Sequence, residues 1–528
     1  MPLPPKKKAP PPKAYIVKHP VKQTVLSSVS TVSHSAKTHV KTHLNGSAHN
    51  ATLPKPSRTP TPSRPSSKEP VERLKTERSR ARANKRASPT ITTPQFSDDD
   101  DEEAEAQPKK RAKTSEMVDP NRQIKDVDAF AGNEAIRASR IHAREIANSD
   151  IIAHNGRNSY EPFFTAFTTN EDPEEAVITT EYPAAASEPE EWHIVVPVVN
   201  KSDFHPHEQI TKNMEVMRDY YLDEESKKIV DNINGSGLLQ ALNRVVRRKG
   251  TDRFVGARTD YISILSQYNE LIRAKRADGT FSAAIDRMQN IPFHLMTRIL
   301  SETCSRTVSP SVESLSKYTA FSDNVYGELL PPFLSRIFKE TGLRSDQVFV
   351  DLGSGVGNCV IQAALETGCT AWGCEMMDSP ARLAAIQAKE FRVRCKLWGF
   401  KAGPVHLIHD DFLQNQQIGE VLKKADVILL NNQAFTAELN DKLKFKFLDV
   451  KEGAKIVSLK YYRDPKYRIK DTTINDPINV LKVVEKERFS NNVSWSSDPG
   501  KWYLHTKDSS ELQAFQARMY ANGGGGER

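Results

Sequence analysis

This 528-residue sequence has few cysteines, no long apolar run and a low apolar fraction. Its five cysteines are an odd number without a Cys-x-x-Cys pair, which favours reduced intracellular thiols over a disulfide framework or a zinc site. No apolar run approaches the ~18 residues that span a bilayer, and the basic start has no apolar segment behind it. We therefore expect no bound metal, no membrane association and no secretion. Because the apolar fraction of 38% is below the ~45–50% of an ordinary globular chain, part of the chain is predicted to be unfolded.

Aromatic residues are scarce in the first 97 residues, which hold only Tyr15 and Phe96. The same segment has 15 of the 32 prolines, and 19 Lys and Arg against three acidic residues, a net charge of +16. Such a segment cannot bury enough apolar surface to offset its ordering entropy, so we expect disorder. An acidic run, Asp98–Glu105, and a basic run, Pro108–Lys113, follow it, and the predicted tail covers residues 1–115. Residues 98–528 carry a net charge of −8.

Three interpretations of these charge runs remain open. They can form a solvated tail that keeps the protein soluble. Pro108–Lys113 or Arg78–Arg86 can be a nuclear-import signal. Clustered Lys and Arg can also bind nucleic acid without sequence readout, because they release its condensed counterions. The last two interpretations are compatible with each other.

The rest of the chain changes character in four steps. Residues 116–155 are polar with patchy helical character, and we expect a linker there. Residues 156–345 are predicted to hold a strand at Trp192–Val199 and then a small helical subdomain. Its amphipathic helices are predicted at Met214–Leu222, Gly237–Val246, Tyr261–Ile272 and Pro292–Leu300. Residues 346–515 form the next domain, and residues 516–528 are expected to be a disordered C-terminal tail.

Short apolar runs alternate with helix-length segments in residues 346–515. The runs are Val348–Gly357, Thr370–Glu375, Val405–Phe412, Ala425–Asn432 and Ala454–Lys460. Continuous apolar strands that alternate with helices are typical of a parallel sheet covered on both faces. We therefore predict a doubly wound α/β domain whose ligand lies at the carboxyl ends of the strands.

The first of these strands ends in a glycine-rich turn, Asp351–Gly357, and a helix is predicted to begin at Asn358. Glycines let the backbone turn tightly and approach a ligand, and a helix N-terminus offers unpaired N–H groups. The spacing Gly-x-Gly-x-Gly differs from the dinucleotide pattern Gly-x-Gly-x-x-Gly, which cradles a pyrophosphate. An acid at the strand end suits a ligand with an amino-acid moiety better than a diphosphate.

Polar side chains also follow the next three strands. Glu375 can accept hydrogen bonds from both hydroxyls of a ribose, and Asp410–Phe412 offers a carboxylate and a ring for an adenine. Each acid alone fits a solvated loop, but acids at three successive strand ends indicate a nucleoside along the sheet edge. Asn431–Phe435 resembles the loop that surrounds a nitrogen nucleophile in amino-group methyltransferases. An Asx turn that caps the following helix explains it equally well.

Six ordered motifs resemble one family, the non-SET histone H3 lysine-79 methyltransferases called disruptor of telomeric silencing. The match spans roughly the last 330 residues, and the basic N-terminal extension resembles the fungal branch. The motifs are Tyr318–Leu330, Val348–Gly368, Gly373–Asp378, Asp410–Phe412, Asn431–Phe435 and Glu452–Lys460. The resemblance implies a seven-stranded class I methyltransferase sheet and S-adenosyl-L-methionine as methyl donor. It also implies that up to three methyl groups are added to lysine 79 of histone H3 in nucleosomes.

The resemblance further implies a donor site and a channel for the substrate lysine. The implied catalytic residues are Tyr326, Asn431 and Phe435. The implied donor-binding residues are Tyr326, Gly327, Glu328, Leu329, Phe349, Val350, Asp351, Leu352, Gly353, Ser354, Gly355, Val356, Gly357, Asn358, Glu375, Asp411 and Phe412. Two positions depart from the family pattern: Gln433 replaces an aromatic residue, and Trp502 stands where a channel tyrosine is expected. Trp495, nearby in the sequence, fits an ordinary core residue.

The family also implies roles in chromatin regulation, telomeric silencing and the DNA-damage checkpoint. We expect a monomeric nuclear protein whose basic tail contacts nucleosomal DNA. No motif side chain is an obvious strong base, so Tyr326 and Asn431 are expected to position the lysine amine rather than deprotonate it. Two other functions remain open: an S-adenosylmethionine-dependent nucleic-acid methyltransferase, and a catalytically idle module that binds chromatin and keeps the fold.

Overall fold

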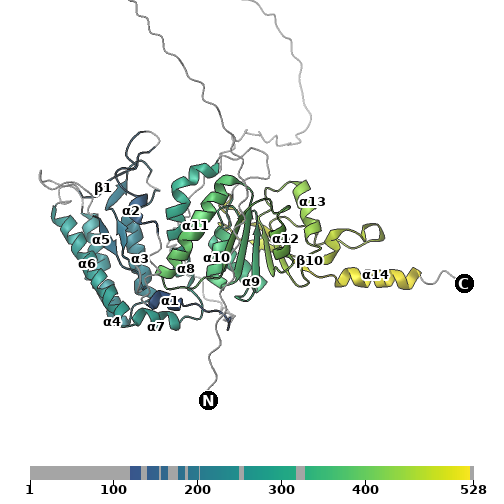
Figure 1. Ribbon diagram of the computed structural model, residues 1–528, viewed down its shortest axis with the longest axis horizontal. Helices are drawn as coiled ribbons and strands as arrows, with labels where there is room; N and C mark the ends of the chain where they lie inside the picture. Colours follow the sequence, from purple (N-terminus) through teal and green to yellow (C-terminus); the bar gives the residue numbers. More distant parts are fainter. Residues whose placement is uncertain are drawn as a thin grey trace, which may run out of the picture. The chain divides into compact units, whose positions relative to one another are not determined.

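The computed structural model describes most of the chain after residue 118 (Figure 1). The described residues are 119–131, 140–153, 156–164, 177–184, 188–200, 203–232, 234–248, 255–316 and 327–523. The predicted tail, residues 1–115, lies outside them. Within these ranges, no helix has the length and apolar character to cross a membrane, and no cluster of three or more His, Cys, Asp or Glu is arranged to hold a metal ion.

Seven strands form one mixed sheet in the C-terminal part of the chain. They are β5 (Val348–Leu352), β6 (Thr370–Glu375), β7 (Val405–His409), β8 (Val427–Leu430), β9 (Lys455–Ser458), β10 (Leu481–Arg488) and β11 (Gly500–Lys507). Their order is β10-β11-β9-β8-β5-β6-β7, and the pairs among β5 to β9 are parallel. Strand β11 runs antiparallel to both of its neighbours. The predicted doubly wound α/β domain with seven strands is confirmed.

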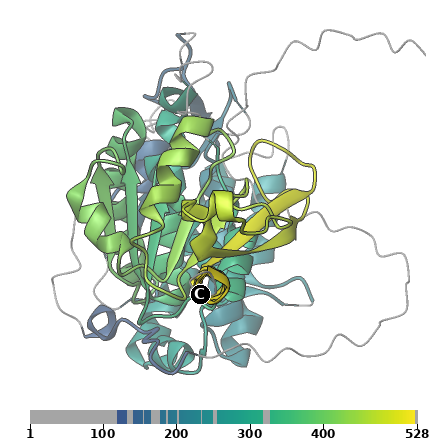
Figure 2. The ribbon, with the colours of Figure 1, turned by 90° about the vertical axis from the view of Figure 1, so that its right-hand side faces the viewer.

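Helices cover both faces of this sheet (Figure 1 and Figure 2). One face packs against α9 (Pro331–Thr341) and α10 (Asn358–Thr367), and the other against α12 (Gln416–Leu422) and α13 (Ala437–Lys446). Strand β5 shows why the sequence run is continuously apolar. Phe349 packs in the first of these cores and Val350 in the second, and both side chains are fully buried.

The residues before the sheet form a largely helical region. Its helices are α3 (Pro206–Tyr220), α4 (Glu224–Val230), α5 (Leu238–Arg247), α6 (Val255–Ala277), α7 (Thr280–Asp286) and α8 (Phe293–Thr307). The four predicted helices lie in α3, α5, α6 and α8, whereas α4 and α7 were not predicted. The remaining short helices of the described chain are α1 (Val127–Phe130), α2 (Ala143–Ile146), η3 (Ser309–Ser316), η4 (Asp471–Thr473) and η5 (Pro477–Val480).

The prediction of one continuous strand at Trp192–Val199 is wrong in its extent. The structure has two short strands there, β3 (Glu190–Trp192) and β4 (Val195–Pro197). Strand β3 pairs with β2 (Ile178–Thr180), whereas β4 pairs with β1 (Tyr160–Pro162). The chain changes partner between the two strands, so one apolar run serves two separate two-stranded sheets.

Part of the predicted linker packs against the α/β domain. The Asp119 carboxylate accepts hydrogen bonds from the backbone N and the Oγ of Ser345, each at 2.8 Å. Arg122 donates through Nη2 to the carbonyl of Leu365 at 2.8 Å, near the end of α10. At the other end of the domain, α14 (Ser510–Gly523) continues past residue 515, where the tail was predicted to begin. Residues 119–122 of the predicted linker therefore contact the residues around the domain, and residues 516–523 of the predicted tail are helical.

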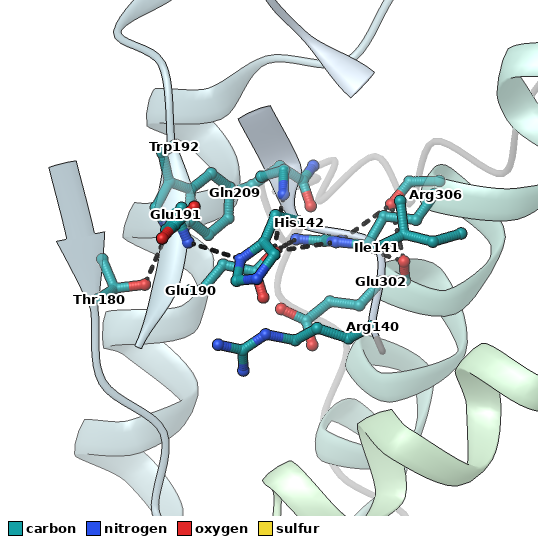
Figure 3. Close-up of polar contacts among 12 residues, drawn as sticks. Arg140, Ile141, His142, Thr180, Glu190, Glu191, Trp192, Gln209, Glu302 and Arg306 are labelled. Atoms are coloured by element: carbon teal, nitrogen blue, oxygen red, sulfur yellow. Dashed lines mark hydrogen bonds and ion pairs between the residues drawn. The ribbon is translucent and has the colours of Figure 1, made fainter. Parts of the chain in front are cut away.

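A buried ionic network joins β3 to α8 and to α11 (Asp378–Leu397). Figure 3 shows the part of it around Glu190 and Arg306. The Glu190 carboxylate accepts from Arg394 Nη1 at 2.7 Å and from Arg306 Nη2 at 3.1 Å, and all three side chains are buried. Burial alone would raise the pKa of Glu190, but Arg394 and Arg306 hold it well below its usual range. Because an unpaired buried charge is costly, this network fixes α8 and α11 relative to β3.

Candidate active site

A cavity of about 560 Å³ lies at the carboxyl ends of β5, β6 and β8, where the sequence predicts the ligand. Most of the predicted site residues line it. They are Gly327, Glu328, Leu329, Asp351, Gly353, Ser354, Gly355, Val356, Asn358, Glu375, Asp411, Phe412, Asn431 and Phe435. Side chains from five separate segments of the chain therefore meet in one place.

Five predicted site residues are not among those that line the cavity. Phe349, Val350 and Leu352 are core residues of β5, because alternate side chains of this strand point into the two helix-covered faces. Gly357 precedes α10 as its N-cap residue. Tyr326 lies outside the described residues, so its predicted role stays a prediction.

All three glycines of the glycine-rich turn have left-handed backbone, and Gly355 has a φ of +54°. Gly353 has a φ of +84° and Gly357 a φ of +87°, in the left-handed region that side chains disfavour. A Cβ at Gly353 would lie 3.5 Å from the ring of Phe435, and one at Gly357 would lie 3.2 Å from Leu407. The turn therefore allows the backbone to approach both the cavity and the neighbouring strand closely.

The Glu375 carboxylate is held in place by two backbone N–H groups. Its Oε2 accepts from Gly355 N at 2.9 Å, and its Oε1 accepts from Met377 N at 2.8 Å. Each carboxylate oxygen has a second lone pair, so both oxygens can still accept a hydrogen bond from a ligand in the cavity. This arrangement suits the two neighbouring hydroxyls of a ribose.

Asp351 places a second carboxylate in the cavity, with only 3% of the residue exposed to solvent. Burial raises its pKa to about 7, and the negative charge of Glu375 acts in the same direction, whereas a hydrogen bond with Cys359 opposes the shift. A ligand cation beside this carboxylate would favour its ionised form. Asp351 is thus suited to an ammonium group.

The two acidic residues after β7, Asp410 and Asp411, have different roles. Asp410 is engaged locally, because its carboxylate accepts from Asp411 N and from Asn415 Nδ2, each at 2.8 Å. Asp411 lines the cavity together with Phe412, whose ring stacks on Phe435 with the centroids 6.4 Å apart. The Asp411 carboxylate can therefore accept a hydrogen bond from the exocyclic amine of a flat base, and the two aromatic rings can pack against the base.

The two amides after β8 also have different roles. Asn431 donates through Nδ2 to the carbonyl of Gly327 at 2.9 Å, and its buried Oδ1 has no hydrogen-bond partner among the described residues. Asn432 is fully buried and accepts from Leu459 N and Lys460 N, which ties β8 to the end of β9. Helix α13 is capped by Thr436 instead. The Asx-turn alternative is therefore wrong, and Asn431 offers the cavity an unused acceptor.

The two positions that depart from the family pattern do not line the cavity. Gln433 is exposed, whereas Trp502 is fully buried, packs edge-on against Phe333 at 5.9 Å and donates through Nε1 to the carbonyl of Glu487. Nine residues that are not among the predicted site residues also line the cavity: Cys359, Met376, Met377, Leu413, Ala434, Thr436, Glu438, Leu439 and Lys442. Trp495, which is expected to be an ordinary core residue, contacts the site from outside the cavity. A Cβ at Gly327 would lie 2.6 Å from its ring, so Trp495 covers the Gly327 backbone.

The segment around Trp495 also holds the loop at Gly327–Leu329 in place. Glu328 N donates to Ser494 Oγ at 2.9 Å, and Ser494 N donates to the carbonyl of Glu328 at the same distance. Leu329 forms an antiparallel bridge with Val493. No local pattern predicts this contact, because more than 160 residues separate its two sides.

The sheet has the strand order of a class I S-adenosylmethionine-dependent methyltransferase, with β11 as its single antiparallel strand. The cavity after β5, whose lining suits a nucleoside, lies where this class binds its methyl donor. The family described as "Histone methylation protein DOT1" matches residues 304–507. A "Histone-lysine N-methyltransferase, H3 lysine-79 specific" of Emericella nidulans is 40% identical over 412 residues, which cover 78% of each chain. An Aspergillus fumigatus protein with the same description is 40% identical over 413 residues, again 78% of each chain. The chain belongs to this DOT1 family of histone methyltransferases.

Among solved structures, the chain is similar to an RNA methyltransferase from Salinibacter ruber in complex with S-adenosyl-L-homocysteine. The identity is 19% and the TM-score 0.23, with 35% of this chain and 95% of the other covered. A likeness of this size adds nothing to the assignment, which depends on the family match and on the sheet.

Proposed function

We propose that this protein transfers methyl groups from S-adenosyl-L-methionine to lysine 79 of histone H3 in nucleosomes, in up to three successive steps. The observation that carries the proposal is the cavity itself. Asp351, Glu375, Asp411, the glycine-rich turn and Asn431 all line it, at the carboxyl ends of the strands of a class I methyltransferase sheet. The relatives named for this reaction match the chain over more than three quarters of its length.

The chemistry of the lining residues fits the methyl donor. Asp351 would take the ammonium group of its amino-acid end, and Glu375 the ribose hydroxyls. Asp411 would accept from the adenine amine, and the rings of Phe412 and Phe435 would pack against the base. S-adenosyl-L-methionine, when bound, supplies a methyl group that its sulfonium already activates. The protein therefore mainly has to hold both substrates in line.

The acceptor lysine must reach the cavity as a neutral amine. A lysine has a pKa of about 10.4 in water, and loss of water around its nitrogen beside the Phe435 ring favours its uncharged form. The Oδ1 of Asn431 can accept a hydrogen bond from this amine and fix its direction, while Phe435 excludes water from the same wall. The lysine loses its proton to solvent before transfer, and the methylammonium that forms loses another before the next methyl group is added, so no strong base is required.

The partners follow from charge as well as from the family. A histone methyltransferase is a chromatin protein, and we propose that it acts on the intact nucleosome in the nucleus as a monomer. Residues 116–528 have a net charge of −5, so they gain little from a general attraction to DNA. The +16 of residues 1–97 can supply that attraction instead.

The test is transfer of a labelled methyl group to three acceptors: nucleosomes, free histone H3 and naked DNA. We expect label in the histone of nucleosomes and none in DNA, and an Asn431→Ala variant should lose most of the transfer while it still binds the donor. Label in naked DNA would identify a nucleic-acid methyltransferase. Donor binding without transfer to any acceptor would identify an idle chromatin-binding module.

A further inference from the structure

A buried glutamine outside the cavity contacts the glycine-rich turn. Gln387 lies in the middle of α11 and is completely buried. Its Nε2 donates to the carbonyl of Val356 at 2.9 Å and to Asn358 Oδ1 at 2.7 Å. Both acceptors belong to residues that line the cavity, whereas Gln387 itself does not. One side-chain amide thus uses both of its hydrogens on the turn and on the start of α10.

Asn358 links Gln387 to Glu328 on another wall of the cavity. With its Oδ1 held by Gln387, its Nδ2 points the opposite way and donates to Glu328 Oε1 at 2.8 Å. Glu328 belongs to the loop that Ser494 holds from behind. A single file of hydrogen bonds therefore runs from α11 through α10 to the loop at Gly327–Leu329.

The same part of the turn is also fixed by apolar packing. The Val356 side chain is 1% exposed and packs with Cys304, Val308, Leu315 and Leu383, which come from α8, from the residues that follow it and from α11. Packing fixes the side chain of Val356, and Gln387 fixes its carbonyl. The turn is therefore attached to α11 by two independent kinds of contact.

We propose that Gln387 is a positioning residue for methyl-donor binding, which acts by orienting Asn358 and, through it, Glu328. The proposal rests on the donor site proposed above. If Asn358 were released, its amide could rotate, and the Glu328 carboxylate would lose one of its hydrogen bonds at the cavity wall. The Val356 carbonyl would at the same time be left buried without a partner. The expected effect is on donor affinity, since Gln387 does not line the cavity.

The experiment measures donor binding by calorimetry on the full chain, with Gln387→Leu as the main variant. Loss of two hydrogen bonds to buried acceptors should raise the donor Kd about tenfold. The turnover at saturating donor should stay within about threefold of the wild type, because the cavity keeps all of its lining side chains. If Gln387→Leu does not fold, the isosteric Gln387→Glu serves instead, since it has at most one hydrogen to donate where the amide has two.

A matched control separates positioning from a loss of stability. Asn269 in α6 is also a buried amide that bonds two backbone groups, the carbonyl of Thr179 at 2.8 Å and Glu181 N at 3.0 Å. It lies in the helical region and does not line the cavity. Asn269→Leu should lower the melting temperature and leave the donor Kd unchanged.

A double-mutant cycle with Glu328→Gln tests the path of the effect. If Gln387 acts through Asn358 and Glu328, the two substitutions together should raise the Kd by clearly less than the product of their separate effects. A donor Kd for Gln387→Leu within twofold of the wild type, or strictly multiplicative effects in the cycle, would overturn the proposal. A wild-type protein that does not bind the donor would instead contradict the proposed function.

Discussion

The affinity for the methyl donor should depend on pH through Asp351. This carboxylate lines the cavity, and burial together with Glu375 raises its pKa to about 7. Donor binding would place an ammonium group in the same cavity, and the ammonium favours the ionised carboxylate. Binding below pH 7 therefore has to remove a proton from Asp351, and the affinity should fall as the pH decreases.

The size of the effect follows from the pKa. With a value of about 7, Asp351 is ionised in roughly a tenth of the molecules at pH 6 and in about three quarters at pH 7.5. The donor's own α-amino group, with a pKa of about 7.7 to 8.0, stays mostly protonated over this range. Because part of the donor loses its proton at pH 7.5, the donor Kd should be about five- to sixfold higher at pH 6 than at pH 7.5.

Calorimetric titration at several pH values measures this dependence, and Asp351→Asn is the reference. The variant should bind more weakly at pH 7.5, and its Kd should change little with pH. At pH 6, titrations in buffers of different ionisation enthalpy should show about one proton released per donor bound by the wild type. A wild-type Kd that stays constant between pH 6 and pH 7.5 would refute the reasoning.

The raised pKa of Asp351 also makes the stability of the donor-free protein depend on pH. Because the folded pKa of Asp351 lies above its usual value of 3.8, the group contributes stability below about pH 4 that is lost as the pH rises through about 7. The free energy of unfolding of the wild type relative to Asp351→Asn should therefore decrease over this window, by up to about 4 kcal/mol. Denaturant unfolding of both proteins at pH 5 and pH 8 should show about 2.5 kcal/mol of this decrease.

Two further predictions concern the turn and the tail. Gly355→Arg should abolish donor binding in calorimetry, because the added side chain would enter the cavity that Gly355 lines. Gly355 has a φ of +54° and Gly453 a φ of +83°, so an arginine at either position takes a left-handed backbone. Gly453→Arg has open space around it and should leave binding intact. Full activity of Gly355→Arg would contradict the donor assignment. Deletion of residues 1–113 should flatten the salt dependence of nucleosome binding, since the slope scales with the phosphates that Lys and Arg neutralise. An unchanged slope would leave the tail as a solvated extension.

The sequence predicts those parts of the site that depend on residues close together in the chain. The apolar run of β5, the glycines that adopt left-handed backbone and the acids at strand ends all follow from short-range rules. Their meeting in one cavity follows from the sheet, because the carboxyl ends of parallel strands share an edge. The sequence could not separate residues of the strand from residues of the site, so Phe349, Val350 and Leu352 were assigned to the donor site although they belong to the core.

The residues that the sequence does not predict depend on contacts between distant segments. Trp495 lies against Gly327 although the two are far apart in the chain, and its local pattern is that of a core residue. Gln387 lies inside an ordinary amphipathic helix, and only the fold brings it to Val356. Arg122, in a segment with no clear pattern, reaches the end of α10. Polar side chains that act through one hydrogen-bond partner leave no periodic signal in a sequence.

The central claim is that this chain methylates one lysine of the histone core. Mass spectrometry of the histones, after nucleosomes are incubated with the purified full-length protein and S-adenosyl-L-methionine, tests it most directly. One, two and three added methyl groups are expected on lysine 79 of histone H3, with much less methylation when Asn431→Ala replaces the wild type. Methylation of a different histone residue, or a histone core that stays unmodified while the protein binds its donor, would contradict it.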